Sequence, residues 1–210
     1  MREPIPFPFR PTCERVILMK KAAFALLLAF LLPFAACGKA ETVSASSEKE
    51  PLSEDSPVLP EEMPEDFAIR FLDWIDPEQA NVLDTFDGRI QKDLVEDGMA
   101  ETSFTPSDAL RTELYRLVRE SGIVSIRRAM TSHVLATGDE RVDCEPLWCF
   151  RVIFRADGKT YRIDGDITAE HYRGTDPDAD RFLAFCSQVS ELLRDLPEFR
   201  ALPEPRGAYE

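Results

Sequence analysis

Residues 148–164 read Trp-Cys-Phe-Arg-Val-Ile-Phe-Arg-Ala-Asp-Gly-Lys-Thr-Tyr-Arg-Ile-Asp, two apolar-rich runs on either side of an Asp-Gly pair. Asp-Gly between such runs is typical of a two-residue hairpin turn, because both central residues of that turn need a positive φ. A turn at Asp157-Gly158 pairs Phe154 with Tyr161, Val152 with Ile163, and Arg151 with Asp164. Each such pair contributes roughly 0.2–1 kcal/mol. The segment therefore predicts a β-hairpin with one apolar face turned to a core.

The residues upstream predict a further strand and a second hairpin. Residues 67–74 are rich in aromatic and aliphatic side chains and are followed by Asp76-Pro77, which is typical of a strand that ends in a turn. Residues 82–86 and 89–94 flank Asp87-Gly88, which again favours a two-residue turn. Residues 134–137 are interpreted as a short strand, and residues 123–130 fit either a short strand or a helical turn.

Two amphipathic helices are expected among these strands. The first begins with Thr105 as its N-cap and Pro106 at the first helical position, and Gly122 ends it. The second begins by the same cap-then-proline pattern at residues 175–177 and continues to about Asp195. Its apolar residues recur at helical spacing, at Phe182, Phe185, Cys186, Val189, Leu192 and Leu193.

These elements predict an α+β fold in which an antiparallel sheet built from hairpins is covered on one face by two helices. A single globular domain is expected over residues 66–203, long enough to bury one core. Residues 204–210 are expected to form a loose tail. Residues 37–65 are interpreted as an acidic stalk, because Ser, Glu, Pro and Asp dominate and such a composition favours disorder.

An apolar run near the N-terminus predicts where the protein is located. Lys20 and Lys21 precede about fifteen apolar residues, fewer than the roughly 20 that a membrane-spanning helix needs, and this order is that of a secretory signal peptide. The run ends in Ala35-Ala36-Cys37, which resembles the lipobox of bacterial lipoprotein precursors, with Phe34 where that family usually has Leu, Val or Ile. The resemblance implies that residues 1–36 are removed and that Cys37 becomes a lipidated diacylglyceryl cysteine with further acyl chains such as palmitate.

Two further interpretations concern this N-terminal region. The Pro-rich residues 1–18 do not fit the front of a signal peptide, so translation is expected to start at Met19. The alternative interpretation of Cys37 is that it is an ordinary, unlipidated cysteine after a cleaved secretion signal.

The net charge restricts the class of partner. The chain has a formal charge of −14, and residues 1–36 hold five basic and two acidic residues, so their removal leaves −17. Such a surface repels phosphate backbones, which argues against nucleic acid as a partner. It also repels anionic lipid, so we expect attachment to the extracytoplasmic face of a bacterial membrane through the lipid on Cys37.

The remaining cysteines allow one disulfide and predict no metal site. Cys144 and Cys149 are close in sequence, and an extracytoplasmic location permits a bridge between them; two free thiols are the alternative. Cys186 falls on the apolar stripe of the last helix and is interpreted as a small buried hydrophobic residue. No Cys-x-x-Cys pair occurs, and only His133 and His171 are available as histidine ligands, so a structural zinc site is not expected.

Asp164, Asp166 and His171 form the densest group of titratable residues beside a predicted strand end. Two carboxylates and an imidazole buried together would suit general acid–base catalysis, as in a small envelope hydrolase. The alternative is a set of capping and solvated side chains, because acidic residues are frequent throughout this chain. No Gly-x-Ser-x-Gly elbow and no phosphate-binding glycine loop occurs, and no cofactor is predicted.

The segment Asn81–Phe86, together with residues 91–94 and the Asp-Gly-Lys-Thr-Tyr hairpin at 157–161, resembles uncharacterised lipoprotein domains of Gram-positive anaerobes. This resemblance implies a surface location and no known activity. The leading hypothesis is a non-catalytic binding module at the cell envelope, whose partner is an envelope protein, peptide or glycan. The alternatives are the hydrolase described above and an accessory solute-binding lipoprotein.

Overall fold

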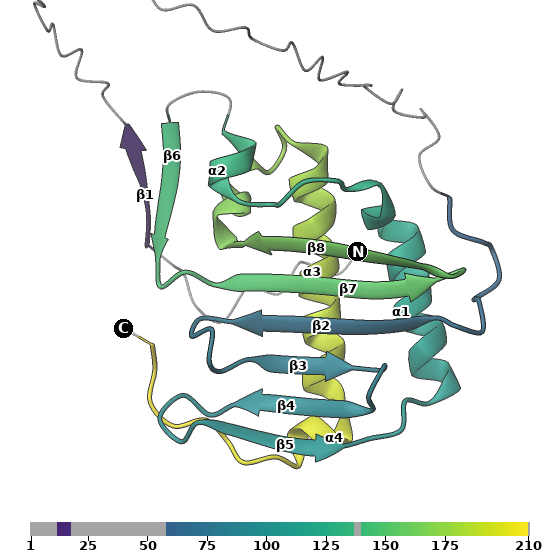
Figure 1. Cartoon of the computed structure of the whole chain (residues 1–210). Coiled ribbons are helices and arrows are strands. Elements are labelled where there is room, and N and C mark those ends of the chain that lie inside the picture. The colour runs from purple at the N-terminus through teal and green to yellow at the C-terminus, as the bar shows by residue number, and fades with distance from the viewer. Residues whose placement is uncertain (1–11, 18–57, 137–139, 210) are drawn as a thin grey trace, which may run out of the picture. The chain divides into compact units, whose positions relative to one another are not determined.

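A six-stranded antiparallel sheet organises the structure (Figure 1). The computed structural model describes residues 12–17, 58–136 and 140–209. The order of the strands across the sheet is β5-β4-β3-β2-β7-β8. The strands are β2 (Ala68–Trp74), β3 (Asn81–Asp84), β4 (Arg89–Asp93), β5 (Met99–Ser103), β7 (Cys149–Ala156) and β8 (Lys159–Asp166).

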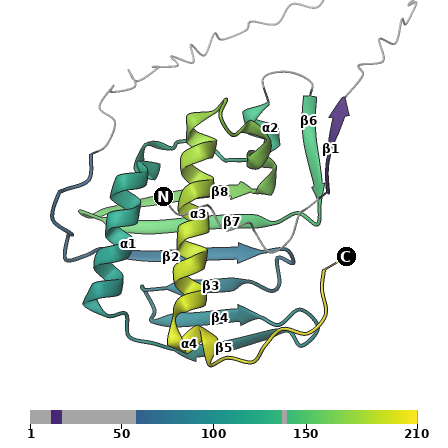
Figure 2. The ribbon, with the colours of Figure 1, turned by 180° about the vertical axis from the view of Figure 1, so that it is seen from behind.

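Two long helices lie on the same face of this sheet, α1 (Asp108–Ser121) and α3 (Pro177–Asp195) (Figure 2). The other face carries no helix in the described part of the chain (Figure 1). The shorter helical segments are η1 (Ile123–Ser125), α2 (Ser132–Leu135), η2 (Ile167–Tyr172) and α4 (Pro197–Arg200). The predicted fold class, an antiparallel sheet covered on one face by two helices, is confirmed.

A separate two-stranded ribbon pairs β1 (Thr12–Ile17) with β6 (Glu140–Glu145). Its antiparallel register places Cys13 opposite Cys144. The apolar run of the expected signal peptide, Cys37 and the expected stalk as far as residue 57 lie outside the described residues.

The core lies between the sheet and the two long helices. Phe71, Phe150 and Phe154 from the sheet and Phe182 and Phe185 from α3 are fully buried. The rings of Phe150 and Phe182 meet edge to face with their centroids 6.2 Å apart. Aromatic pairs in this arrangement contribute about 0.5–1.5 kcal/mol beyond the area they bury, so they help to fix how α3 sits on the sheet.

The hairpin of β7 and β8 forms in the predicted register. Phe154 faces Tyr161, and the other two expected pairs are also present. Asp157 and Gly158 have φ values of 53° and 70°, as a two-residue turn requires. The carboxylate of Asp66 accepts hydrogen bonds from both backbone N–H groups of the turn, at 3.0 and 2.9 Å. The turn is therefore tied to the residues that lead into β2.

The helix ends agree with the sequence in most places. Asp176 is the N-cap of α3 with Pro177 directly after it, and Gly122 ends α1 in the left-handed conformation. The expected N-cap of α1, Thr105, is wrong, because Ser107 takes this role and its hydroxyl accepts a hydrogen bond from the N–H of Leu110 at 3.2 Å.

Two other local predictions were wrong for identifiable reasons. The β3–β4 hairpin has a four-residue loop rather than the predicted two-residue turn, because Asp84 pairs with Arg89. The side chain of Asp84 accepts a hydrogen bond from the N–H of Phe86 at 2.9 Å, which stabilises the longer loop. The strand expected at residues 134–137 is wrong, because Val134 and Leu135 belong to the helical turn α2; residue 137 lies outside the described residues. In the first residue of α2, Ser132, the backbone N–H donates to the hydroxyl oxygen of Thr168 (2.7 Å) and the hydroxyl donates to the carbonyl of Val142 (2.7 Å).

The folded domain extends beyond the expected residues 66–203 at both ends. Leu59 is buried in the core, and the hydroxyl of Tyr115 donates to the carbonyl of Pro60 at 2.6 Å. At the other end, residues 204–209 form a C-terminal strap along β4 and the β4–β5 turn. Arg206 makes a parallel bridge with Val95, so the expected loose tail is held by backbone bonds.

None of the helices in the described ranges is both long enough and apolar enough to span a membrane.

Candidate binding site

The structure does not bring the three predicted catalytic residues into a shared cavity. Asp164 lies on the helix-free face of the sheet, where it accepts a hydrogen bond from Arg162 at 2.7 Å and forms an ion pair with Arg151. Partial burial acts to raise the pKa of Asp164, but these two guanidinium groups outweigh it and hold the pKa below its usual value. A carboxylate stabilised as an anion in this way is a poor general acid.

Asp166 and His171 lie in two further environments. Asp166 caps η2 by accepting the N–H of Thr168 at 2.9 Å, and burial raises its pKa. His171 is exposed near the end of η2, with its ring edge-on to Tyr172 at 5.9 Å. Asp164 thus belongs to an ion-pair network, Asp166 is a helix cap and His171 lies at the surface. This geometry gives the hydrolase hypothesis no support.

The predicted Cys144–Cys149 bridge does not form. Cys144 is disulfide-bonded, whereas Cys149 and Cys186 are free thiols, so the partner of Cys144 is a different cysteine. The two cysteines lie in different sheets: Cys144 is buried and belongs to β6 of the two-stranded ribbon, whereas Cys149 begins β7 of the six-stranded sheet, one residue before the inward-facing Phe150. Burial raises the pKa of Cys149 to about 11, which leaves the thiol protonated and unreactive at neutral pH.

A cleft of about 520 Å³ runs beside β8, the last strand of the sheet. We call it the β8 groove. One wall is Lys159–Asp164 and the other is residues 123–129, with Ile123, Ile126, Tyr161 and Ile163 as apolar lining. The basic lining residues are Arg127, Arg128, Lys159 and Arg162.

The backbone of β8 is open to this groove. The N–H of Met130 bonds to the carbonyl of Asp164 at 2.9 Å and the N–H of Asp166 bonds to the carbonyl of Met130 at 3.0 Å, so one residue already extends the sheet. Backbone groups of alternate residues point to the same edge of a strand. Thr160 and Arg162 therefore direct their N–H and C=O groups into the groove, beyond the point where the chain from η1 leaves β8.

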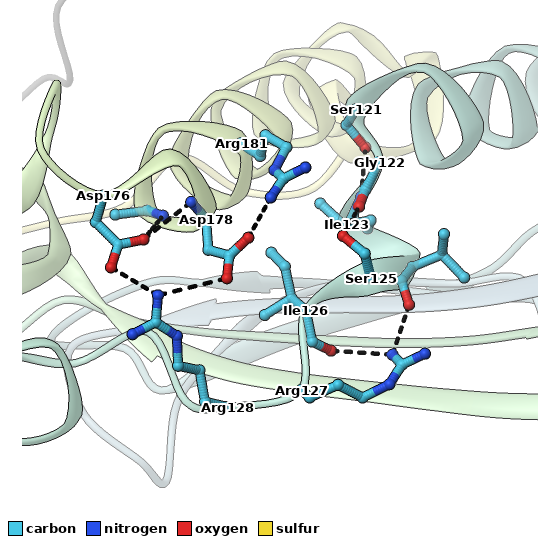
Figure 3. A network of polar contacts seen from close by, with 12 residues as sticks. Ser121, Gly122, Ile123, Ser125, Ile126, Arg127, Arg128, Asp176, Asp178 and Arg181 are labelled. Carbon is cyan, nitrogen blue, oxygen red and sulfur yellow. Dashed lines mark hydrogen bonds and ion pairs between the residues drawn. The ribbon is translucent and has the colours of Figure 1, made fainter. Parts of the chain in front are cut away.

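Polar contacts hold the wall opposite β8 in place (Figure 3). Arg128 bonds to Asp176 at 2.6 Å and Asp178 at 3.4 Å, which ties the wall to the first turn of α3. Arg127 donates to the carbonyls of Val124 at 2.5 Å and Ile126 at 3.2 Å. The wall is thus a fixed surface with side chains held by both local and long-range bonds.

The charges in the groove are only partly balanced. Arg128 and Arg162 pair with carboxylates, whereas Arg127 bonds to two backbone carbonyl oxygens. Lys159 is exposed at the turn end of β8. Neither Arg127 nor Lys159 has an acidic partner among the residues that the structure describes. In a chain of net charge −14, the groove is a local site of positive charge.

Sequence reasoning did not single out these residues as a site. The hairpin prediction placed Lys159 beside the turn, and Arg127-Arg128 is a basic pair in an acidic chain. These residues are more than thirty positions apart in sequence, and only the bridge between Met130 and Gly165 brings them to one edge.

Comparisons with known proteins give no family and no relative: no family model and no curated protein matches this sequence. Within the described ranges, no group of three His, Cys, Asp or Glu residues is arranged to hold a metal ion.

Proposed function

We propose that this chain is an extracytoplasmic bacterial lipoprotein, anchored to the membrane through Cys37, whose domain is a non-catalytic binding module at the cell envelope. We propose further that the module binds an acidic, extended peptide segment of an envelope protein in the β8 groove. The observation that carries this proposal is the open edge of β8 beside basic side chains, of which Arg127 and Lys159 have no acidic partner among the described residues.

The expected mode of binding is the addition of a strand to an exposed sheet edge. The peptide backbone would bond to Thr160 and Arg162, and main-chain bonds of this kind supply affinity without reading sequence. Alternate side chains would meet the groove, carboxylates near Arg127 and Lys159 and apolar groups near Ile126. The negative charge of the rest of the molecule would repel acidic segments elsewhere, so binding would be confined to this edge.

A direct binding measurement tests this proposal. A fluorescent peptide of alternating Glu and Val is titrated with the full chain and its anisotropy is recorded at low and physiological ionic strength. We expect saturable binding that weakens with salt, because the basic groups are partly exposed. Lys159→Glu should weaken it about tenfold or more. Arg173→Glu is an equal change of net charge at the residue after η2, which does not line the groove, and should change binding less than about twofold.

Two results would contradict the proposal. One is an equal loss for Lys159→Glu and Arg173→Glu, which would show a non-specific effect of net charge. The other is undiminished binding of a peptide with N-methylated backbone amides, because such a peptide cannot add a strand to β8.

A further inference from the structure

A second cavity, of about 410 Å³, lies at the end of the sheet where β2 and β4 finish and β3 and β7 begin. Its lining includes Asp73, Asn81, Asp93 and Arg194, and the C-terminal strap contributes Tyr209. We call it the strap cavity. Its volume is within the range of about 300–1,000 Å³ that is usual for small-ligand sites.

Two carboxylates are held in fixed positions in its wall. Asp73 is 1% exposed and accepts hydrogen bonds from the side-chain amide of Asn81 at 2.7 Å and from the hydroxyl of Ser190 at 3.0 Å. The amide oxygen of Asn81 in turn accepts the backbone N–H of Asp93 at 3.0 Å. Asn81 therefore links the two acidic residues, and each carboxylate oxygen of Asp73 retains further acceptor capacity.

Donors line the same cavity. The hydroxyl of Tyr209 donates to Asp93 at 2.7 Å, and Lys92 is paired with Glu204 of the strap at 2.9 Å. Arg194 is half-buried, and its guanidinium makes no hydrogen bond or ion pair with any described residue. Its positive charge acts to lower the pKa of Asp73, but its N–H donors are not taken up by the described residues.

The lining also includes four aromatic side chains. Trp74, Trp148, Phe199 and Tyr209 all contribute to it. Trp148 stacks on Phe150 with centroids 6.0 Å apart, and Lys92 lies 5.2 Å from the ring centre of Phe199, so these rings are held in place by neighbours. The cavity thus joins flat apolar surfaces to a wall of mixed donors and acceptors.

We propose that the strap cavity binds a neutral saccharide. Hydroxyl groups both donate and accept, so a sugar ring can use Arg194 as a donor and Asp73 and Asp93 as acceptors at once. An anion would be opposed by the two carboxylates, and a cation by Arg194 and Lys92. The aromatic rings offer apolar faces to the C–H face of the sugar. This site is separate from the β8 groove and does not depend on it.

The chain carries its own reporter for this site. It contains two tryptophans, Trp74 and Trp148, and both line the strap cavity. Titration of the full chain with N-acetylglucosamine, galactose and maltose should therefore produce a saturable change in intrinsic fluorescence for at least one of them. Arg194→Gln should weaken that binding about tenfold, and Arg173→Gln, at an exposed arginine directly after η2, should leave it unchanged.

Several outcomes are decisive. Glucuronate or glucosamine binding more tightly than the neutral sugars would overturn the assignment of a neutral ligand. Absence of any saturable response up to millimolar sugar, with the chain shown to be folded, would overturn the site. A response that is identical in Arg194→Gln would show that the sugar binds elsewhere. Tyr209→Phe, which keeps the ring and removes the donor, should weaken binding by a smaller factor while thermal stability is kept.

Discussion

Asp73 is a buried acidic residue of β2 that faces Ser190 of α3. Burial raises its pKa, and the hydrogen bonds from Asn81 and Ser190 oppose this only in part. The native state therefore holds the proton of Asp73 more tightly than the unfolded chain does. It follows that the stability contributed by this group is present below its ordinary pKa of 3.8 and is lost as the pH rises through the raised native value.

Asp73→Asn tests this linkage. The amide can still accept from Asn81 and can donate to Ser190, but it carries no charge to desolvate. We expect a higher midpoint of thermal unfolding than wild type at pH 7–8, by about 2–4 °C for each kcal/mol gained, and no difference at a pH below the ordinary Asp value. Calorimetry across this pH range measures it. A variant less stable than wild type at neutral pH would show that the ionised carboxylate stabilises the fold.

Among the contacts between secondary-structure elements, the packing of β8 on α3 depends on one small residue. Gly165 lies in β8 between Phe182 of α3 and Met130, with the position of a Cβ at 2.4 Å from Phe182 Cε1. The backbone at this position is not left-handed, so lack of space rather than strain requires glycine. The same residue forms the bridge with Met130 that sets the end of the β8 groove.

Gly165→Ala should therefore lower stability by about 1–3 kcal/mol, the usual cost of overpacking a core. The midpoint of denaturant unfolding measures the loss, and Thr160→Ala, on the exposed part of the same strand, serves as the matched control with little effect expected. If the two variants were equally stable, the close approach of β8 and α3 would be wrong. Because the change also shifts Met130, Gly165→Ala should weaken peptide binding in the β8 groove as well.

The proposed removal of residues 1–36 would affect the molecule as a whole. The ribbon pairs β1 with β6, and β1 lies within the residues 1–36 that the proposed maturation removes. Removal would deprive β6 of its described strand partner and would leave the backbone of Glu140–Glu145 exposed as an edge. The two-layer domain would keep its core, because the buried residues described there begin at Leu59.

Cys37→Ser tests the anchoring proposal. In a bacterial host the wild-type chain should be recovered with the membrane fraction and should have a mature N-terminus at Cys37 with a lipid adduct, because two or more acyl chains hold a protein firmly to a bilayer. The serine variant should lose the lipid adduct and the processed N-terminus. Cys149→Ser is the matched control and should behave as wild type. Equal lipid labelling of Cys37→Ser and wild type would refute lipidation at this residue.

Much of the fold follows from patterns a few residues long. The Asp157-Gly158 turn and its register depend on residues that are neighbours in the chain, and the cap of α3 depends on Asp176 and the proline after it. The same reasoning failed for α2, because Ser132 is held by Thr168 and Val142 rather than by its own neighbours. It also failed for the β3–β4 turn, where the side chain of Asp84 stabilises a longer loop.

The candidate sites could not be predicted from such short sequence patterns. Asp164, Asp166 and His171 are close in sequence, but Asp164 pairs with arginines on β8, Asp166 caps the start of η2, and His171 lies near the end of η2. The residues that the structure does bring together are distant: Ser190 bonds to Asp73 across 117 positions, and Tyr209 to Asp93 across 116. Amino-acid order alone was sufficient for the β7–β8 hairpin, the end of α1, the cap of α3 and the fold class, because these depend on local hydrogen bonds and periodicity. The β8 groove and the strap cavity were decided by tertiary packing, which alone determines which distant side chains meet.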